Sequence, residues 1–335
     1  MISDQPAVFP KVVWDLATPR RVLRAHLGVA AIRRLHATSR AWDLVLFFGT
    51  WAFAGLTTAA LIILPFGPLW VVAGLLQQIA TMNCLYAVRH DIFFHRGVGG
   101  RLGEALAVLC SLPLLNTYTG FLQHEDHHRH VGWDLFEEPM AHLDRRWKRW
   151  FCLTTVGAVL MFMGRLRSAD APQPNRGFTP PESFRRRLRR ERRIHQLFAL
   201  VLVAATIRWP EIVGKGFVLP TFLFTGLIVM IRIAFQHSET DRNNPFHLSV
   251  YYRPNRLLAL LFFNTLGAGH LVHHIYPRIP IYRIGEAVRL MHPVLVAKGV
   301  PERGMLEVLW RYFVRGEAYR EPWGELPAQA RPRRR

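Results

Sequence analysis

The chain has 335 residues, half of them hydrophobic, yet its formal net charge is +20. Apolar runs alternate with arginine-rich blocks, and this segregation is typical of an integral membrane protein rather than a soluble one. The three cysteines lie in or near apolar stretches without any Cys-x-x-Cys pair, so we expect small buried side chains and exclude a disulfide framework or a zinc knuckle.

The chain begins with a basic segment, residues 1–41, that we expect in the cytoplasm. It has no apolar stretch followed by a small-residue cleavage site, so no secretory signal peptide is expected. A membrane-spanning helix needs about 20 mostly apolar residues. The first two candidates cover residues 42–63 and 69–88, and the short turn LPFGP between them predicts an antiparallel hairpin.

Two further apolar stretches, residues 102–122 and 150–164, are ambiguous. Pro113 interrupts the first stretch, and the second is short for a span. Both could lie in the membrane interface or under a cytosolic cap. If either one alone crossed the bilayer, the histidine motifs described below would no longer meet on one side, so we expect neither to cross.

A second hairpin is predicted from spans at residues 194–209 and 218–235, joined by RWPEIVGK. An arginine-rich run, residues 185–193, precedes this hairpin, and the tail, residues 296–335, ends in RPRRR. The positive-inside rule places both termini and the arginine run in the cytoplasm, with a membrane domain over residues 42–295. Because the run adjoins a span and no nucleic-acid motif accompanies it, we expect it near anionic headgroups and expect no nucleic-acid partner.

Nine of the 16 histidines occur in four short motifs: HDIFFH (His90, His95), HEDHH (His124, His127, His128), FQHSE (His237) and HLVHH (His270, His273, His274). In His-x-x-His-His the three imidazoles share one face of a helix, and imidazole is the commonest metal ligand in proteins. His90 and His95 are five positions apart, so they need a helix end or a kink to serve one site. Nine imidazoles exceed the ligand number of one ion, which favours two ions.

Acidic side chains flank these motifs. Asp91, Glu125, Asp126 and Glu239 could accept a hydrogen bond from the far ring nitrogen of a ligand histidine and orient it. The alternative for each is a solvated surface carboxylate. The whole pattern predicts an all-α integral membrane protein, with four transmembrane helices in two hairpins and a cytosolic helical cap that carries a histidine-rich di-metal site.

The motifs HDIFFH, HEDHH and HLVHHIYPRIP resemble the three histidine boxes of the membrane fatty acid desaturase superfamily. The resemblance covers about Trp42 to Pro280, and the first box matches the H-x4-H variant rather than HDxxH. It implies two iron ions held by the nine histidines, with His237 as the extra ligand after the fourth span. It also implies dioxygen as co-substrate and a fatty acyl chain, as an acyl lipid or acyl thioester, that is desaturated.

Two alternatives stay open. A hydroxylase or ketolase of a lipid, alkane or carotenoid would use the same centre. A membrane metal-binding or transport protein would need polar groups along its spans, and the second span holds Gln77, Gln78 and Asn83.

The sequence contains no haem-binding HPGG motif and no cysteine cluster for an iron–sulfur centre. We therefore expect electrons from a separate acidic donor, ferredoxin or cytochrome b5-like, which the basic charge would steer to the cytosolic cap. The expected location is a bacterial inner membrane or the endoplasmic reticulum, with the active site on the cytosolic side.

Overall fold

The computed structural model describes residues 16–113, 128, 146–158, 182–241 and 244–316, and no β-strand occurs among them. The α-helices are α1 (Ala17–Leu35), α2 (Arg40–Ile63), α3 (Pro68–Gln78), α4 (Tyr86–Val88), α5 (Gly100–Ser111), α7 (Arg146–Cys152), α9 (Glu182–Arg208), α10 (Leu219–His237), α11 (Arg256–Leu261), α12 (Ala268–Ile275), α13 (Ile281–Ala297) and α14 (Met305–Leu309). Four segments are π-helical: η1 (Ile79–Leu85), η2 (Arg89–His95), η4 (Pro210–Val218) and η5 (Trp310–Arg315). The predicted all-α class is confirmed for this part of the chain.

Among the described residues, three continuous helices are long and apolar enough to cross a membrane: Arg40–Ile63, Pro68–His95 and Pro210–Gln236. They correspond to the predicted spans at 42–63, 69–88 and 218–235. The first begins after Ser39, whose side chain accepts a hydrogen bond from the Trp42 backbone N–H and caps the helix. The second continues past its predicted end as far as His95, so His90 and His95 belong to the helix itself.

The remaining predicted span, residues 194–209, forms the second half of α9. The arginine-rich first half belongs to the same continuous helix, and α9 is not among the three apolar helices found in the described residues. Its apolar half exposes large side chains nonetheless, including Leu200 at 68% and Ile207 at 78%. The fourth span therefore stays a prediction.

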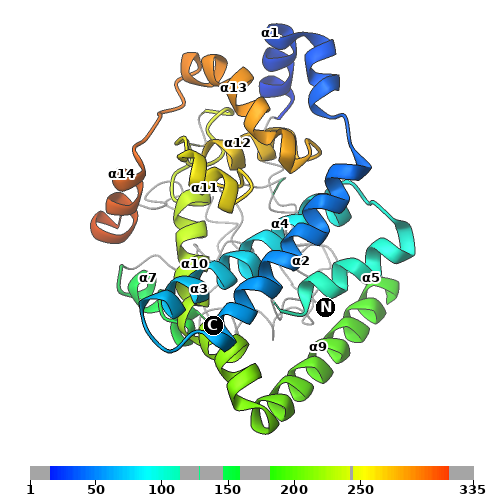
Figure 1. Cartoon of the computed structure of the whole chain (residues 1–335). Helices are drawn as coiled ribbons and strands as arrows, with labels where there is room; N and C mark the ends of the chain where they lie inside the picture. Colours follow the sequence, from blue (N-terminus) through cyan, green and yellow to red (C-terminus); the bar gives the residue numbers. More distant parts are fainter. Residues whose placement is uncertain (1–15, 114–127, 129–145, 159–181, 242–243, 317–335) are drawn as a thin grey trace, which may run out of the picture.

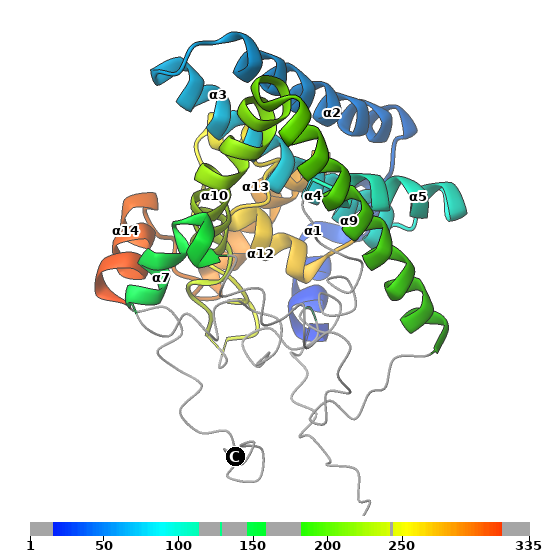
Figure 2. The same ribbon diagram turned by 90° about the horizontal axis from the view of Figure 1, so that it is seen from below.

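The two ambiguous stretches begin as short helices. The 12-residue α5 is about 18 Å long, against a hydrocarbon core of about 30 Å, so it is too short to cross. Helix α7 has only 7 residues and lies beside α14 in Figure 2. The Trp150 indole N–H donates to the Phe313 carbonyl at 3.0 Å, which ties α7 to η5. The rest of both stretches lies outside the described residues.

The three apolar helices of the described residues pack against one another. Helix α3 lies against both α2 and α10, and η4 lies against both α2 and α9. At one end of the molecule the Lys215 ammonium of η4 donates to the Ile62 carbonyl of α2 at 3.0 Å. Helices α1, α12 and α13 gather at the opposite end in Figure 1, where their apolar side chains share one buried core.

Buried amides of α3 join it to η4 and α10. The Gln77 amide donates to the Gly216 carbonyl at 3.2 Å, and the Gln78 amide donates to the Thr221 hydroxyl at 3.2 Å. The Thr225 hydroxyl donates to Gln78 at 2.8 Å. Interhelical hydrogen bonds of this kind contribute about 1 kcal/mol each in membranes. The glutamines, which were polar exceptions in the sequence of the second span, thus hold the helices together.

Helix packing against α10 depends on a small residue. A Cβ atom added at Gly226 would lie 2.6 Å from the backbone carbonyl of Thr154, which cannot rotate away. Gly226→Ala should therefore lower the free energy of unfolding by about 1–3 kcal/mol, measured by denaturant titration in detergent. Gly55→Ala is the matched control, because nothing lies within 4 Å of that Cβ position in α2. Equal effects of the two substitutions would contradict this packing.

Candidate metal centre

A π-helical turn brings the first two candidate histidines together. The Arg96 backbone N–H donates to the Asp91 carbonyl, five positions earlier, at 3.2 Å. Such i→i+5 bonding widens the turn, so residues five apart face the same side. The Nε2 atoms of His90 and His95 accordingly lie 3.1 Å apart. The kink that this spacing required is η2.

Helix α12 presents the third motif. His270 and His274 are one turn apart, and their Nε2 atoms lie 3.0 Å from each other. Gly267, just before the helix, has φ +51°, and a Cβ there would lie 2.4 Å from the Tyr252 ring. Its N–H donates to the Phe235 carbonyl at 2.8 Å. The start of α12 is thereby fastened to the end of α10, the helix that carries His237.

Four imidazoles from three segments converge at the end of the second apolar helix. One nitrogen from each of His90, His95, His128 and His273 lies within 4.8 Å of the others. The His128 and His273 Nε2 atoms are 3.1 Å apart although 145 positions separate them in the chain. The ring centroids of His90 and His273 are 4.7 Å apart. All four belong to the candidate set from the sequence.

The geometry of this cluster fits a metal ion. Two nitrogens bound to one ion at about 2.1 Å and at right angles lie about 3 Å apart, as the paired Nε2 atoms do here. His270 and His274 form a separate pair, and the His274 ring centroid is 4.5 Å from that of His128. The described imidazoles therefore form one group of four and an adjacent group of two.

The structure does not describe the side chains of the other candidate histidines or of two of the candidate acids. His124, His127, Glu125 and Asp126 lie outside the described residues, and of His237 only the backbone is described, as the last residue of α10.

Asp91 lies between the two histidines of η2, but its hydrogen bonds go elsewhere. Its carboxylate accepts from the Arg96 guanidinium at 2.9 Å and from the Ile281 backbone N–H at 3.4 Å. Arg96 also donates to both oxygens of Asp43 in α2, at 2.6 and 3.0 Å. These buried groups join η2 to the starts of α2 and α13. Asp91 thus links η2 to Arg96 and to the start of α13, whereas the sequence left open a hydrogen bond to an imidazole or a solvated carboxylate.

Glu239 also has arginine partners. Its carboxylate accepts from Arg303 at 2.7 and 3.1 Å, and the Arg311 guanidinium lies 3.6 Å away. Burial would raise the pKa of Glu239, but the hydrogen bond and charge of Arg303, with the charge of Arg311, hold it below its ordinary value. The carboxylate fastens the chain after α10 to the start of α14.

The sequence did not predict the contact of Tyr86 with the cluster. The Tyr86 ring stacks on the His90 imidazole with centroids 5.6 Å apart, and the Arg232 guanidinium lies 4.3 Å from the centre of the Tyr86 ring. Arg232 donates to the Met82 carbonyl at 3.2 Å. A charged residue inside an apolar span was the signal that could have identified this contact. Tyr86 follows η1 and precedes His90 by one turn, so the stack helps to hold that ring.

Outside the cluster, His195 is a buried structural histidine. Its Nδ1 lies 2.8 Å from the Glu191 carbonyl, and its Nε2 lies 3.0 Å from the Ser111 hydroxyl. It lies outside the four histidine motifs of the sequence. The three cysteines are free and buried, as expected.

Comparison with known proteins agrees with the histidine motifs. The model of the family described as fatty acid desaturase matches residues 68–304. This range includes all nine candidate histidines, the second apolar helix and α12. A search of the curated proteins finds no match.

Proposed function

The chain belongs to the fatty acid desaturase family, and from this premise we propose that it is an oxidoreductase that desaturates a fatty acyl chain at a di-iron centre. The acyl chain would be part of a lipid or of an acyl thioester. The observation that carries the proposal is the convergence of four imidazoles at the end of a helix long enough to cross a membrane. A family of lipid-oxidising enzymes and a metal-binding geometry beside an apolar layer support the same chemistry.

Six described histidines would hold the metal. His90, His95, His128 and His273 suit one ion, and His270 with His274 would contribute to the second. Two iron ions, when bound, would supply the oxygen activation that removal of hydrogen from an alkyl chain requires. Asp91 and Arg96 hold η2 in position, and Tyr86 supports the His90 ring. We assign these residues to the positioning of the ligand histidines.

The proposed reaction converts a CH2–CH2 unit of the chain into CH=CH. The two hydrogens removed, two electrons and two protons reduce dioxygen to two waters. The electrons would come from a separate acidic carrier, ferredoxin or cytochrome b5-like, attracted by the net charge of +20. We place the centre and this docking surface on the cytosolic side, in accordance with the arginine asymmetry of the sequence.

The test is turnover by the purified, iron-loaded protein in lipid with oxygen, a reductant system and a series of acyl lipids, followed by mass spectrometry. The expected product has lost two hydrogens from its acyl chain, and the same mixture without oxygen should give none. A product that has gained oxygen instead would establish the hydroxylase or ketolase alternative. If neither product forms from any acyl lipid tested, the acyl proposal is wrong.

A further inference from the structure

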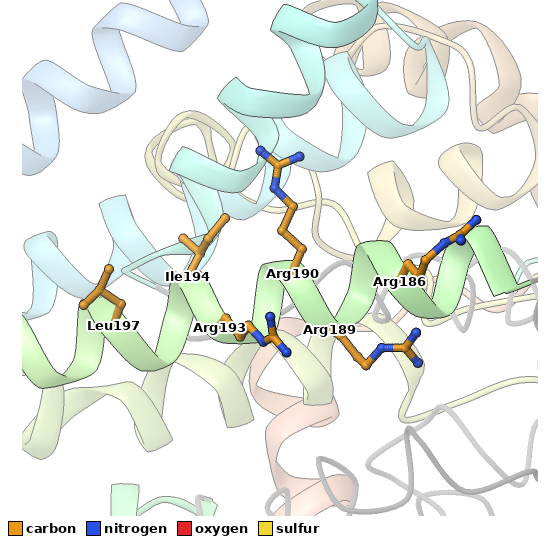
Figure 3. A pocket seen from close by; sticks show the side chains of 6 residues that line it. All are labelled: Arg186, Arg189, Arg190, Arg193, Ile194 and Leu197. Carbon is orange, nitrogen blue, oxygen red and sulfur yellow. The ribbon is translucent and has the colours of Figure 1, made fainter.

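A shallow pocket of about 370 Å³ lies along one face of α9, and none of the clustered histidines is among its lining residues. Four arginines and two aliphatic residues line it: Arg186, Arg189, Arg190, Arg193, Ile194 and Leu197. Their spacing of three and four residues puts all six on one side of the helix. Figure 3 shows Arg190 extending from one side of this face and Arg189 and Arg193 from the other, so the guanidinium groups surround the pocket.

Most of this positive charge is uncompensated. Arg189 donates to the Glu182 carboxylate at 2.6 Å, and both side chains are half exposed. Within the part of the chain that the structure describes, Arg186, Arg190 and Arg193 form no ion pair. Guanidinium groups bind phosphate oxygens through paired, charge-assisted hydrogen bonds. Three such groups around one pocket favour an anionic ligand of the phosphate class.

The same face becomes apolar within one turn of the arginines. Ile194 and Leu197 complete the pocket, and Leu197 is 63% exposed. The exposed aliphatic surface continues to Leu200 and Val201, towards the turn with η4. A ligand that matches the whole face therefore has a phosphate at one end and a hydrocarbon chain at the other. The described lining contains no aromatic ring on which a nucleic-acid base could stack.

The opposite face of α9 fixes this orientation. His195 is buried. Its Nε2 lies 3.0 Å from the Ser111 hydroxyl of α5, and its Nδ1 lies 2.8 Å from the Glu191 carbonyl of its own helix. Glu191 is itself only 3% exposed. Because these residues point into the protein, the arginine face must point away from it, where a lipid can approach.

We propose that this face of α9 is a binding site for one anionic phospholipid. The phosphate would lie among Arg186, Arg190 and Arg193, and an acyl chain would lie along Ile194 and Leu197. The site would hold α9 at the membrane surface and would be separate from the substrate of the proposed oxidation. It does not depend on that proposal.

Lipid retention by the full chain tests the site. The purified protein is placed in bilayer discs of equal phosphatidylcholine and phosphatidylglycerol, and the lipids that remain bound after transfer to neutral detergent are measured by native mass spectrometry. The test variant is R186Q/R190Q/R193Q. The matched control, R101Q/R256Q/R289Q, removes three other exposed arginines from α5, α11 and α13 and leaves the same net charge. Melting in neutral detergent and metal content verify that each variant is folded.

The wild type should retain phosphatidylglycerol in preference to phosphatidylcholine. Each basic residue near an anionic surface contributes about fivefold in affinity, so the test variant should lose the preference by at least tenfold while the control stays within about twofold of the wild type. R186K/R190K/R193K, which keeps the charge, should retain part of it.

Three results would overturn the proposal. The first is an equal loss in the control, which would make net charge the cause, and the second is undiminished retention in the test variant. Competition with inorganic phosphate separates the possible sources of the phosphate group. Complete displacement of the lipid by phosphate at millimolar concentration would show a phosphate site without a lipid chain and would also overturn it.

Discussion

His273→Ala is expected to remove most of the bound metal and to abolish turnover. His273 is the residue through which the described imidazoles connect: its Nε2 is 3.1 Å from that of His128, and its ring centroid is 4.9 Å from that of His95. Loss of even an indirect partner of a metal ligand lowers metal affinity or activity by about 10–100-fold, so loss of a ligand should exceed about 100-fold. The helical fold should persist, because α12 keeps its apolar contacts in the core with α1 and α13.

Metal analysis after growth with added iron measures this effect, with two ions per chain expected for the wild type. His292→Ala is the control, because His292 is a partly buried histidine of α13 that contacts Tyr251 rather than the cluster. It should keep its metal and its turnover. Full metal content in His273→Ala would show that the cluster is not the metal site, and one ion in the wild type would contradict the di-iron proposal.

Arg96→Met should cause the largest loss of stability of any substitution near the cluster. The Arg96 side chain is 5% exposed and joins Asp43 and Asp91, whose side chains are 11% and 2% exposed. Removing the shared cation leaves two buried carboxylates without a counter-charge. Breaking a buried ion pair from one side costs about 3–5 kcal/mol, so the free energy of unfolding should fall by that amount. Metal content should fall as well, since Asp91 lies within η2.

Denaturant titration in detergent checks the size of this loss. The control is Arg283→Met in α13, where a partly exposed guanidinium lies 3.5 Å from Glu286, and it should cost less than about 1 kcal/mol. The triple variant D43N/D91N/R96M removes both carboxylate charges and should recover much of the stability. A loss in Arg96→Met no larger than that of the control would contradict a stabilising role for this ion network.

The chemistry of the candidate site could be predicted from local patterns. A His-x-x-His-His motif places imidazoles on one face through helix periodicity alone, so the pairing of His270 with His274 needed no tertiary information. Apolar runs likewise predicted the three helices of the described residues that can span a membrane, because the required length and composition are properties of each segment's own sequence. The family match covers the same histidine motifs, because it too depends on local sequence. The orientation in the membrane stays a prediction.

Other features depended on contacts between distant segments. Helical periodicity predicted His90 and His95 on different faces, but the π-helical turn η2 brings them together. Contacts with other helices hold this turn: Arg96 donates to Asp43 of α2, and Asp91 accepts from the Ile281 N–H of α13. Residue identity gave Asp91 several possible partners, and packing selected Arg96, because a buried carboxylate is stabilised most by a neighbouring cation. His128 and His273 lie 145 positions apart in the chain, and no local pattern specifies the contact that places their Nε2 atoms 3.1 Å from each other.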